Sequence, residues 1–105
     1  SIVEAWAQSE SYALSIYHTA SKMLAGGSIG SESSLGKIFW SELDHMMHQT
    51  ALKILGASAE LSLDSKHDAA KWIKGFMFSY AGPIYAGTNE IQKNIIAERL
   101  LGLPK

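Results

Sequence analysis

The chain has 105 residues, enough for one domain and too few for two, and its 47% hydrophobic and 18% charged composition excludes a disordered chain. Nine basic and ten acidic residues give a net charge of −1, which argues against a nucleic-acid partner. The absence of cysteine excludes a disulfide scaffold, and no apolar run approaches the ~18 residues of a membrane span, so we expect a cytoplasmic protein with no membrane partner.

The first half of the chain predicts two helices. Hydrophobic residues recur at intervals of three and four over residues 2–25, which is typical of an amphipathic helix, and Gly26-Gly27 ends it. Residues 26–34 form a Gly/Ser loop, and Ser33 or Ser34 would cap a second helix over residues 35–55. Gly56 ends that helix.

The second half predicts two further helices separated by a sharp break. After a polar connection over residues 57–66, Ser65 or Asp68 would cap a third helix that continues to about residue 80. Gly82-Pro83 then interrupts the helical pattern, because proline lacks an N–H donor and disfavours helical geometry in the residue before it.

The last helix has clear start and stop signals. Thr88 is a good N-cap, Glu90 places a carboxylate in the first turn, and Gly102 is a stop signal. No alternation typical of strands persists anywhere. We therefore expect an all-α fold, an antiparallel up-and-down bundle of four helices joined by short loops.

One pair of residues has the spacing of a metal site. Glu42 and His45 stand three apart, as in di-metal carboxylate bundles. Such sites need a second Glu-x-x-His, and neither His18 nor His67 follows a glutamate at that spacing. The alternative is that Glu42, His45 and Gln49 form a solvated helix face, and we expect no metal.

Other patterns are weak signals of chemistry. The glycine-rich run 26–30 follows no strand and precedes no Lys-Ser or Lys-Thr pair, so a flexible turn explains it better than a phosphate loop. The serines lie mostly in loops or at helix starts, where capping explains them. The three tryptophans lie in or beside apolar helical stripes, which favours packing over ligand stacking.

The segment from Gly82 to Gln92 joins a chain break to a capped helix start. We expect free backbone N–H groups at residues 88–90, which could dock a phosphate or another acceptor-rich ligand. Gly87 removes a side chain where a ligand would approach. An ordinary helix cap explains the same residues equally well.

Residues 85–105, YAGTNEIQKNIIAERLLGLPK, strongly resemble the closing segment of the acyl-CoA dehydrogenases, Tyr-x-Gly-Thr-x-Glu/Gln-Ile-Gln followed by a terminal helix. Weaker likeness to this family covers Phe39–Leu43 and Ala51–Gly56. The spacing from Trp72 to the closing segment resembles an actinobacterial branch of acyl-CoA and steroid side-chain enzymes.

The resemblance implies a flavoenzyme of lipid metabolism and fatty acid β-oxidation that binds FAD and an acyl-CoA. A base removes the α-proton, FAD accepts the β-hydride, and the electrons leave to an electron-transfer flavoprotein. Residues 1–105 resemble only the C-terminal helical domain, so we expect a fragment of a longer subunit that forms a homo- or hetero-oligomer. By itself this chain is expected to be inactive.

The resemblance also assigns site residues by position. Gly87 corresponds to an acyl-CoA contact, and Thr88, Asn89 and Glu90 correspond to FAD contacts. Ala86 occupies the position of the glutamate base found in many members, and alanine cannot accept a proton. The catalytic base is therefore unknown. Residues 56–82 also lack the Gln-x-x-Gly-Gly-x-Gly run that holds FAD across a subunit interface in many members.

A function of another class is also compatible with the sequence. The apolar, weakly charged composition suits self-association, as expected for a stand-alone helical interaction module without catalytic activity.

Overall fold

A computed structural model describes residues 1–60 and 68–104. Its helices are α1 (Ile2–Leu24), α2 (Glu32–Leu55), α3 (Ala57–Glu60), α4 (Asp68–Ser79) and α5 (Asn89–Ile95), and a π-helix, η1 (Ile96–Leu100), continues α5. No strand occurs among the described residues. The predicted all-α fold class is confirmed.

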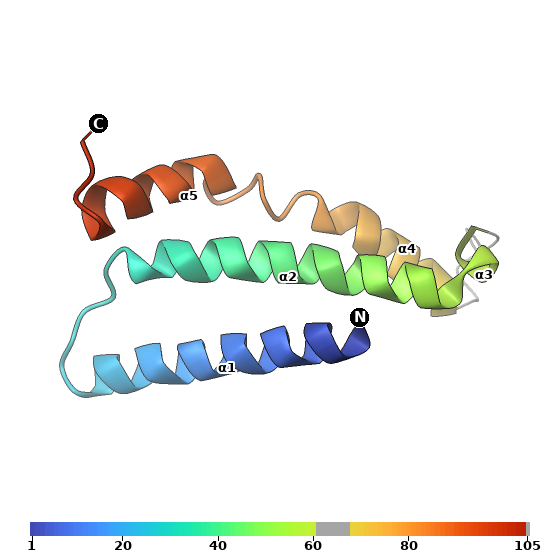
Figure 1. Cartoon of the computed structure of the whole chain (residues 1–105), viewed down its shortest axis with the longest axis horizontal. Coiled ribbons are helices and arrows are strands. Elements are labelled where there is room, and N and C mark those ends of the chain that lie inside the picture. Colours follow the sequence, from blue (N-terminus) through green and yellow to red (C-terminus); the bar gives the residue numbers. More distant parts are fainter. Residues whose placement is uncertain (61–67, 105) are drawn as a thin grey trace.

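Helix α2 is the centre of the fold (Figure 1). Helix α1 runs antiparallel along one side of α2, while α4 and α5 follow each other along another side. Within the described part of the chain, α1 contacts no helix but α2, and α4 does not contact α5. The up-and-down bundle topology therefore stays a prediction, because these helices do not close around a shared core.

Local hydrogen bonds explain where α1 and α2 begin. Glu4 N–H donates to Ser1 Oγ at 3.2 Å, which forms a capping box at the start of α1. Helix α2 begins at Glu32, earlier than predicted, and neither Ser33 nor Ser34 is its N-cap. The reason is that Ser34 N–H already bonds to the carbonyl of Ser31, which closes a turn before the predicted start.

The connection after α2 differs in part from the prediction. Residues 57–60 form the short helix α3, and Ala59 is buried there. The Ala59 N–H bonds to the Gly56 carbonyl, so the chain resumes helical turns directly after the glycine. The remainder of the predicted connection and the candidate cap Ser65 lie outside the described residues. Asp68 is the first described residue of α4, and its role as a cap stays a prediction.

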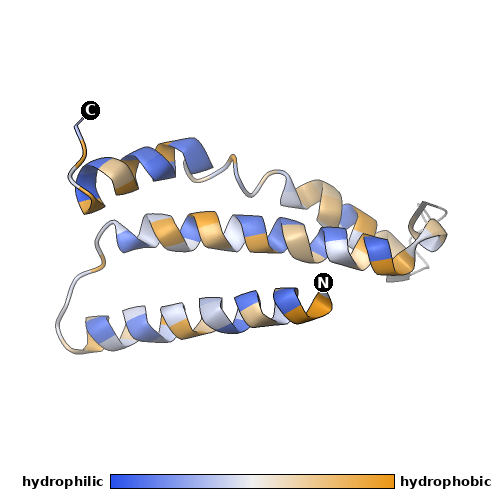
Figure 2. Ribbon diagram, viewed as in Figure 1, coloured by the Kyte–Doolittle hydropathy of each residue, from blue (hydrophilic) through white to orange (hydrophobic). Residues whose placement is uncertain are grey.

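The hydrophobic core is small, and much apolar surface stays exposed. Among the described residues the buried hydrophobic side chains are Leu43, Ala59 and Ala70. Figure 2 shows hydrophobic residues along α1, and Trp6 and Leu24 there are 65% and 90% exposed. Because α2 is the one described helix that packs along α1, most of the predicted apolar stripe of α1 lies exposed. No described helix combines the length and hydropathy needed to cross a bilayer.

Candidate functional site

The break between α4 and α5 forms a tight turn with unusual backbone geometry. Ala86 and Gly87 have φ of +56° and +86°, so two successive residues adopt the left-handed conformation. Glycine adopts this conformation freely, whereas alanine pays a steric cost in it. The turn therefore holds strain at Ala86, the position where the resemblance expects a glutamate base.

Gln92 braces this turn from the following helix. Its Nε2 donates to the carbonyl oxygen of Ala86 at 3.0 Å. A Cβ atom on Gly87 would lie 2.8 Å from the same Nε2, so a larger residue would push this side chain aside, and the φ of +86° itself favours glycine. Gln92 is a site residue that was not predicted, although its place in the closing segment was a signal for it.

Thr88 and Glu90 stand as predicted at the start of α5. Thr88 is the N-cap, and its Oγ1 accepts from Ile91 N–H at 3.3 Å. Glu90 lies in the first turn and is exposed. The positive end of the helix dipole stabilises a carboxylate at this position.

Asn89 has a different environment from the one predicted. Only 5% of the residue is exposed, and its N–H donates to the Pro83 carbonyl at 2.9 Å. Its Oδ1 accepts from Lys37 Nζ at 2.8 Å, and its Nδ2 donates to Ser41 Oγ at 3.1 Å. The predicted free N–H at residue 89 is therefore wrong, because the Gly82-Pro83 break turns a carbonyl toward it.

Ser41 is the point where this anchor meets α2. The residue is fully buried, and its Oγ donates to the carbonyl of Ile38 at 3.0 Å. A Cβ on Gly82 would approach Ser41 Cβ to 3.2 Å, so the turn packs closely on the serine. The sequence pattern did not predict Lys37 and Ser41 as site residues. Their four-residue spacing, which places them on one face of a helix, was the only signal.

The turn therefore offers several backbone hydrogen-bond donors. The described residues provide no partner for the backbone N–H groups of Ala86, Gly87, Thr88 and Glu90. Such groups can bind the oxygen or nitrogen acceptors of a ligand. Ala86, in contrast, has no side-chain group that can move a proton.

His45, the metal candidate, lies in the interface between α2 and α4. Its Nδ1 is 2.9 Å from Ser79 Oγ, which itself donates to the Phe76 carbonyl at 2.6 Å. Nδ1 must then be the donor, and Nε2 accepts from Gln49 Nε2 at 3.0 Å. The His45 ring also stacks on Phe76 at 5.3 Å.

These contacts correct the expectation of a solvated face at His45, because both ring nitrogens bond within the protein. Glu42 is exposed, in contrast to the partly buried His45. Among residues 1–60 and 68–104, no three His, Asp or Glu side chains gather in a way that could hold a metal ion.

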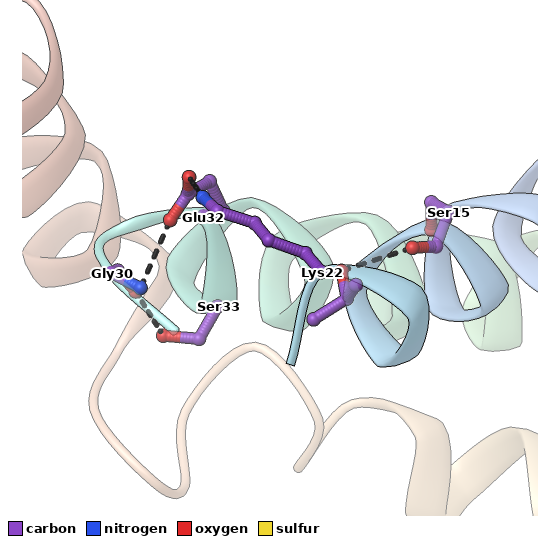
Figure 3. A network of polar contacts seen from close by, with 6 residues as sticks. Ser15, Lys22, Gly30, Glu32 and Ser33 are labelled. Carbon is purple, nitrogen blue, oxygen red and sulfur yellow. Dashed lines mark hydrogen bonds and ion pairs between the residues drawn. The ribbon is translucent and has the colours of Figure 1, made fainter. Parts of the chain in front are cut away.

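A polar network joins the end of α1 to the start of α2 (Figure 3). Lys22 Nζ donates to Glu32 Oε1 at 2.8 Å, and Gly30 N–H donates to Glu32 Oε2 at 3.0 Å. The hydrogen bond from Lys22 is the main cause that lowers the pKa of Glu32 from 4.5 to about 2. The glycine-rich run therefore ends in an ion-paired helix start.

Comparison with known proteins connects this geometry to one family. A family model described as "Acyl-CoA dehydrogenase, C-terminal domain" matches residues 1–101. Acyl-CoA dehydrogenase IpdE1 of Mycobacterium tuberculosis is 35% identical over 74 residues, which are 70% of this chain and 19% of that protein. Its namesake from Mycolicibacterium smegmatis is also 35% identical over 74 residues, 70% of this chain and 18% of that protein. The aligned part thus spans about a fifth of each relative, and no solved structure matches the chain.

Proposed function

Because the chain belongs to the acyl-CoA dehydrogenase family of oxidoreductases and matches its C-terminal domain, we propose that its turn at residues 86–90 helps to bind FAD and acyl-CoA in a longer enzyme. The observation that carries the proposal is the braced turn itself. The N–H groups of its two left-handed residues have no partner in the described part of the chain, Gln92 bonds to the Ala86 carbonyl, and Asn89 bonds to Lys37.

The residues of the turn fit a flavin unequally. Gly87 offers close approach of backbone to a ligand, and Thr88 keeps a hydroxyl proton to donate while its Oγ1 caps the helix. The Asn89 side chain is committed to Lys37 and Ser41. Following the positions that the resemblance implies, we assign Gly87 to acyl-CoA and Thr88 and Glu90 to FAD, and because its side chain is committed to Lys37 and Ser41 we assign Asn89 to positioning these contacts.

The chemistry proposed for the longer enzyme is α,β-dehydrogenation of an acyl-CoA. When bound, FAD would supply the hydride acceptor, and an electron-transfer flavoprotein would remove the electrons. This turn supplies no base for the α-proton, because Ala86 carries only a methyl group. Its contribution is to orient the ligands, and the base belongs to another part of the enzyme.

A second role, oligomer assembly, is favoured by the exposed apolar residues. Most of the large hydrophobic side chains of α1 face solvent in this chain, including Ile2, Trp6 and Leu24. Such surfaces are typical of protein–protein interfaces. If the flavin role fails, the same surface supports a helical interaction module without catalysis.

The complete gene product that contains this chain provides the test. We expect it to purify with bound flavin and to reduce an artificial electron acceptor when given acyl-CoA thioesters. The 105-residue chain is expected to be inactive in the same assay. A complete product that associates but neither binds flavin nor oxidises any acyl-CoA would support the interaction module and contradict the enzyme.

A further inference from the structure

A cavity of about 420 Å³ lies between the start of α2 and the C-terminal segment. Ser31, Ser33 and Ser34 line it from the start of α2. Gln92, Ile95 and Arg99 line it from α5 and η1. The function proposed above gives this cavity no role.

Ser34 is the clearest sign that the cavity takes a ligand. The residue is only 5% exposed and lines the cavity. Its hydroxyl has no hydrogen-bond partner anywhere in the described chain, whereas the neighbouring Ser33 Oγ donates to the Gly30 carbonyl at 3.2 Å. A buried hydroxyl without a partner destabilises the fold. A bound group with acceptor atoms would satisfy it.

The surrounding groups favour a negatively charged ligand. Ser31 is the N-cap of α2, a helix of 24 residues, yet its side chain makes no capping hydrogen bond. Its hydroxyl is therefore available beside the positive end of the helix dipole. From the other side, Arg99 has no ion-pair partner in the described chain. One guanidinium group can donate two parallel hydrogen bonds to two oxygens of a phosphate.

The glutamates that lie beside the lining residues in the sequence do not cancel this charge. Glu32 does not line the cavity, and its two oxygens accept from Lys22 and from Gly30, as Figure 3 shows. The ion pair with Lys22 offsets the negative charge of Glu32. Glu98 does not line the cavity either. The charge of Arg99 therefore remains for a ligand.

We propose that this cavity binds the phosphate group of a small phosphorylated compound. Ser34 Oγ, Ser31 Oγ and the Arg99 guanidinium are its donors. The cavity volume exceeds that of a phosphate, and Ile95 in the lining offers an apolar contact to the organic part. The cavity shares Gln92 with the brace of the turn at residues 86–90, but none of its three proposed donors lies in that turn, so the proposal does not depend on flavin binding.

The test is an NMR titration of the ¹⁵N-labelled chain with inorganic phosphate at constant ionic strength. A second titration uses adenosine 5′-monophosphate. We expect saturable shifts at Ser31, Ser34 and Arg99 with both probes. Tighter binding of the nucleotide would indicate that the organic part is recognised, and equal binding would indicate recognition of the phosphate alone.

Matched variants distinguish binding of phosphate in this cavity from a general attraction of phosphate to positive charge on the chain. Arg99→Gln should weaken phosphate binding about tenfold or more, and Ser34→Ala about fivefold. Lys93→Gln removes the same charge from an exposed position on α5 outside the cavity and should change binding less than about twofold. Arg99 is exposed, so its replacement should leave the fold intact, which circular dichroism can verify.

Two results would overturn the proposal. Shifts that never saturate, or that chloride reproduces, would mean an adventitious ion only. Equal losses in Arg99→Gln and Lys93→Gln would mean that net charge, and not the cavity, attracts phosphate.

Discussion

The ammonium of Lys37 in α2 donates to the amide oxygen of Asn89, the first residue of α5, at 2.8 Å. The two residues are 52 positions apart in the chain. Together with Ser41, this contact determines where α5 begins relative to α2. The turn that we propose as a ligand-binding element therefore depends on a buried polar anchor.

Replacing the anchor should destabilise the chain. Asn89→Ala removes the acceptor of Lys37 and a partner of the fully buried Ser41, so we expect a loss of about 1–3 kcal/mol in the free energy of unfolding. Urea denaturation measures this loss. Asn94→Ala, at an exposed position of α5, is the matched control and should change stability by less than about 0.5 kcal/mol. Equal effects of the two variants would contradict the anchor.

Relieving the strain at Ala86 should stabilise the chain. Ala86→Gly places glycine at a φ of +56°, which alanine adopts at a cost, so we expect a gain of about 1 kcal/mol. Ala25→Gly, at a φ of −79°, is the control and should bring no gain. Thermal melts of wild type and of the two variants measure these changes in stability. A destabilised Ala86→Gly would show that the turn is not strained.

The contacts of His45 with Ser79 and Gln49 should stabilise the fold and not bind a metal. His45→Leu removes the hydrogen bond to Ser79 and the one from Gln49, and we expect a loss of about 1–3 kcal/mol. His18→Leu, at an exposed position of α1, should have little effect. Denaturation in the presence and absence of Zn²⁺ measures both. Stabilisation by zinc that disappears in His45→Leu would instead support a metal site.

The ion pair at the start of α2 should make stability depend on pH. Since the pKa of Glu32 is lowered to about 2 in the folded chain, its contribution is present above the unfolded value near 4.5 and is lost as pH falls toward 2. Wild type should therefore exceed Glu32→Gln in melting temperature at pH 7, and the difference should shrink between pH 4.5 and pH 2. High salt should reduce it as well, because both side chains are exposed to solvent. A difference that is constant with pH would show that the pair does not stabilise the fold.

The features that could be predicted from sequence are those with local causes. Glycine and proline positions located the ends of α1 and α2 and the break before α5, and Thr88 caps α5 as expected. The Glu-x-x-His spacing of Glu42 and His45 is equally local. It said nothing of the α4 residues that contact His45, because those lie more than 30 positions away.

The anchor of the site could not be predicted for the same reason. An asparagine in the first turn of a helix has the same local pattern whether its side chain faces a ligand or a neighbouring helix. The burial of Asn89 depends on Lys37 and Ser41, which approach it only after α2 and α5 pack together. Likewise, the arrangement of α1, α4 and α5 around α2 depends on long-range packing, and helical periodicity alone predicts only which faces are apolar.

The measurement that most directly tests the central claim is flavin binding by the complete gene product carrying Gly87→Ala or Gly102→Ala. Both glycines have positive φ, but a Cβ would meet Gln92 only at residue 87, since residue 102 has open space around it. We predict that Gly87→Ala lowers the flavin content and the affinity for acyl-CoA at least tenfold, whereas Gly102→Ala keeps both near wild type. Retention of flavin and acyl-CoA binding by a folded Gly87→Ala enzyme would contradict the assignment of this turn to the ligand site.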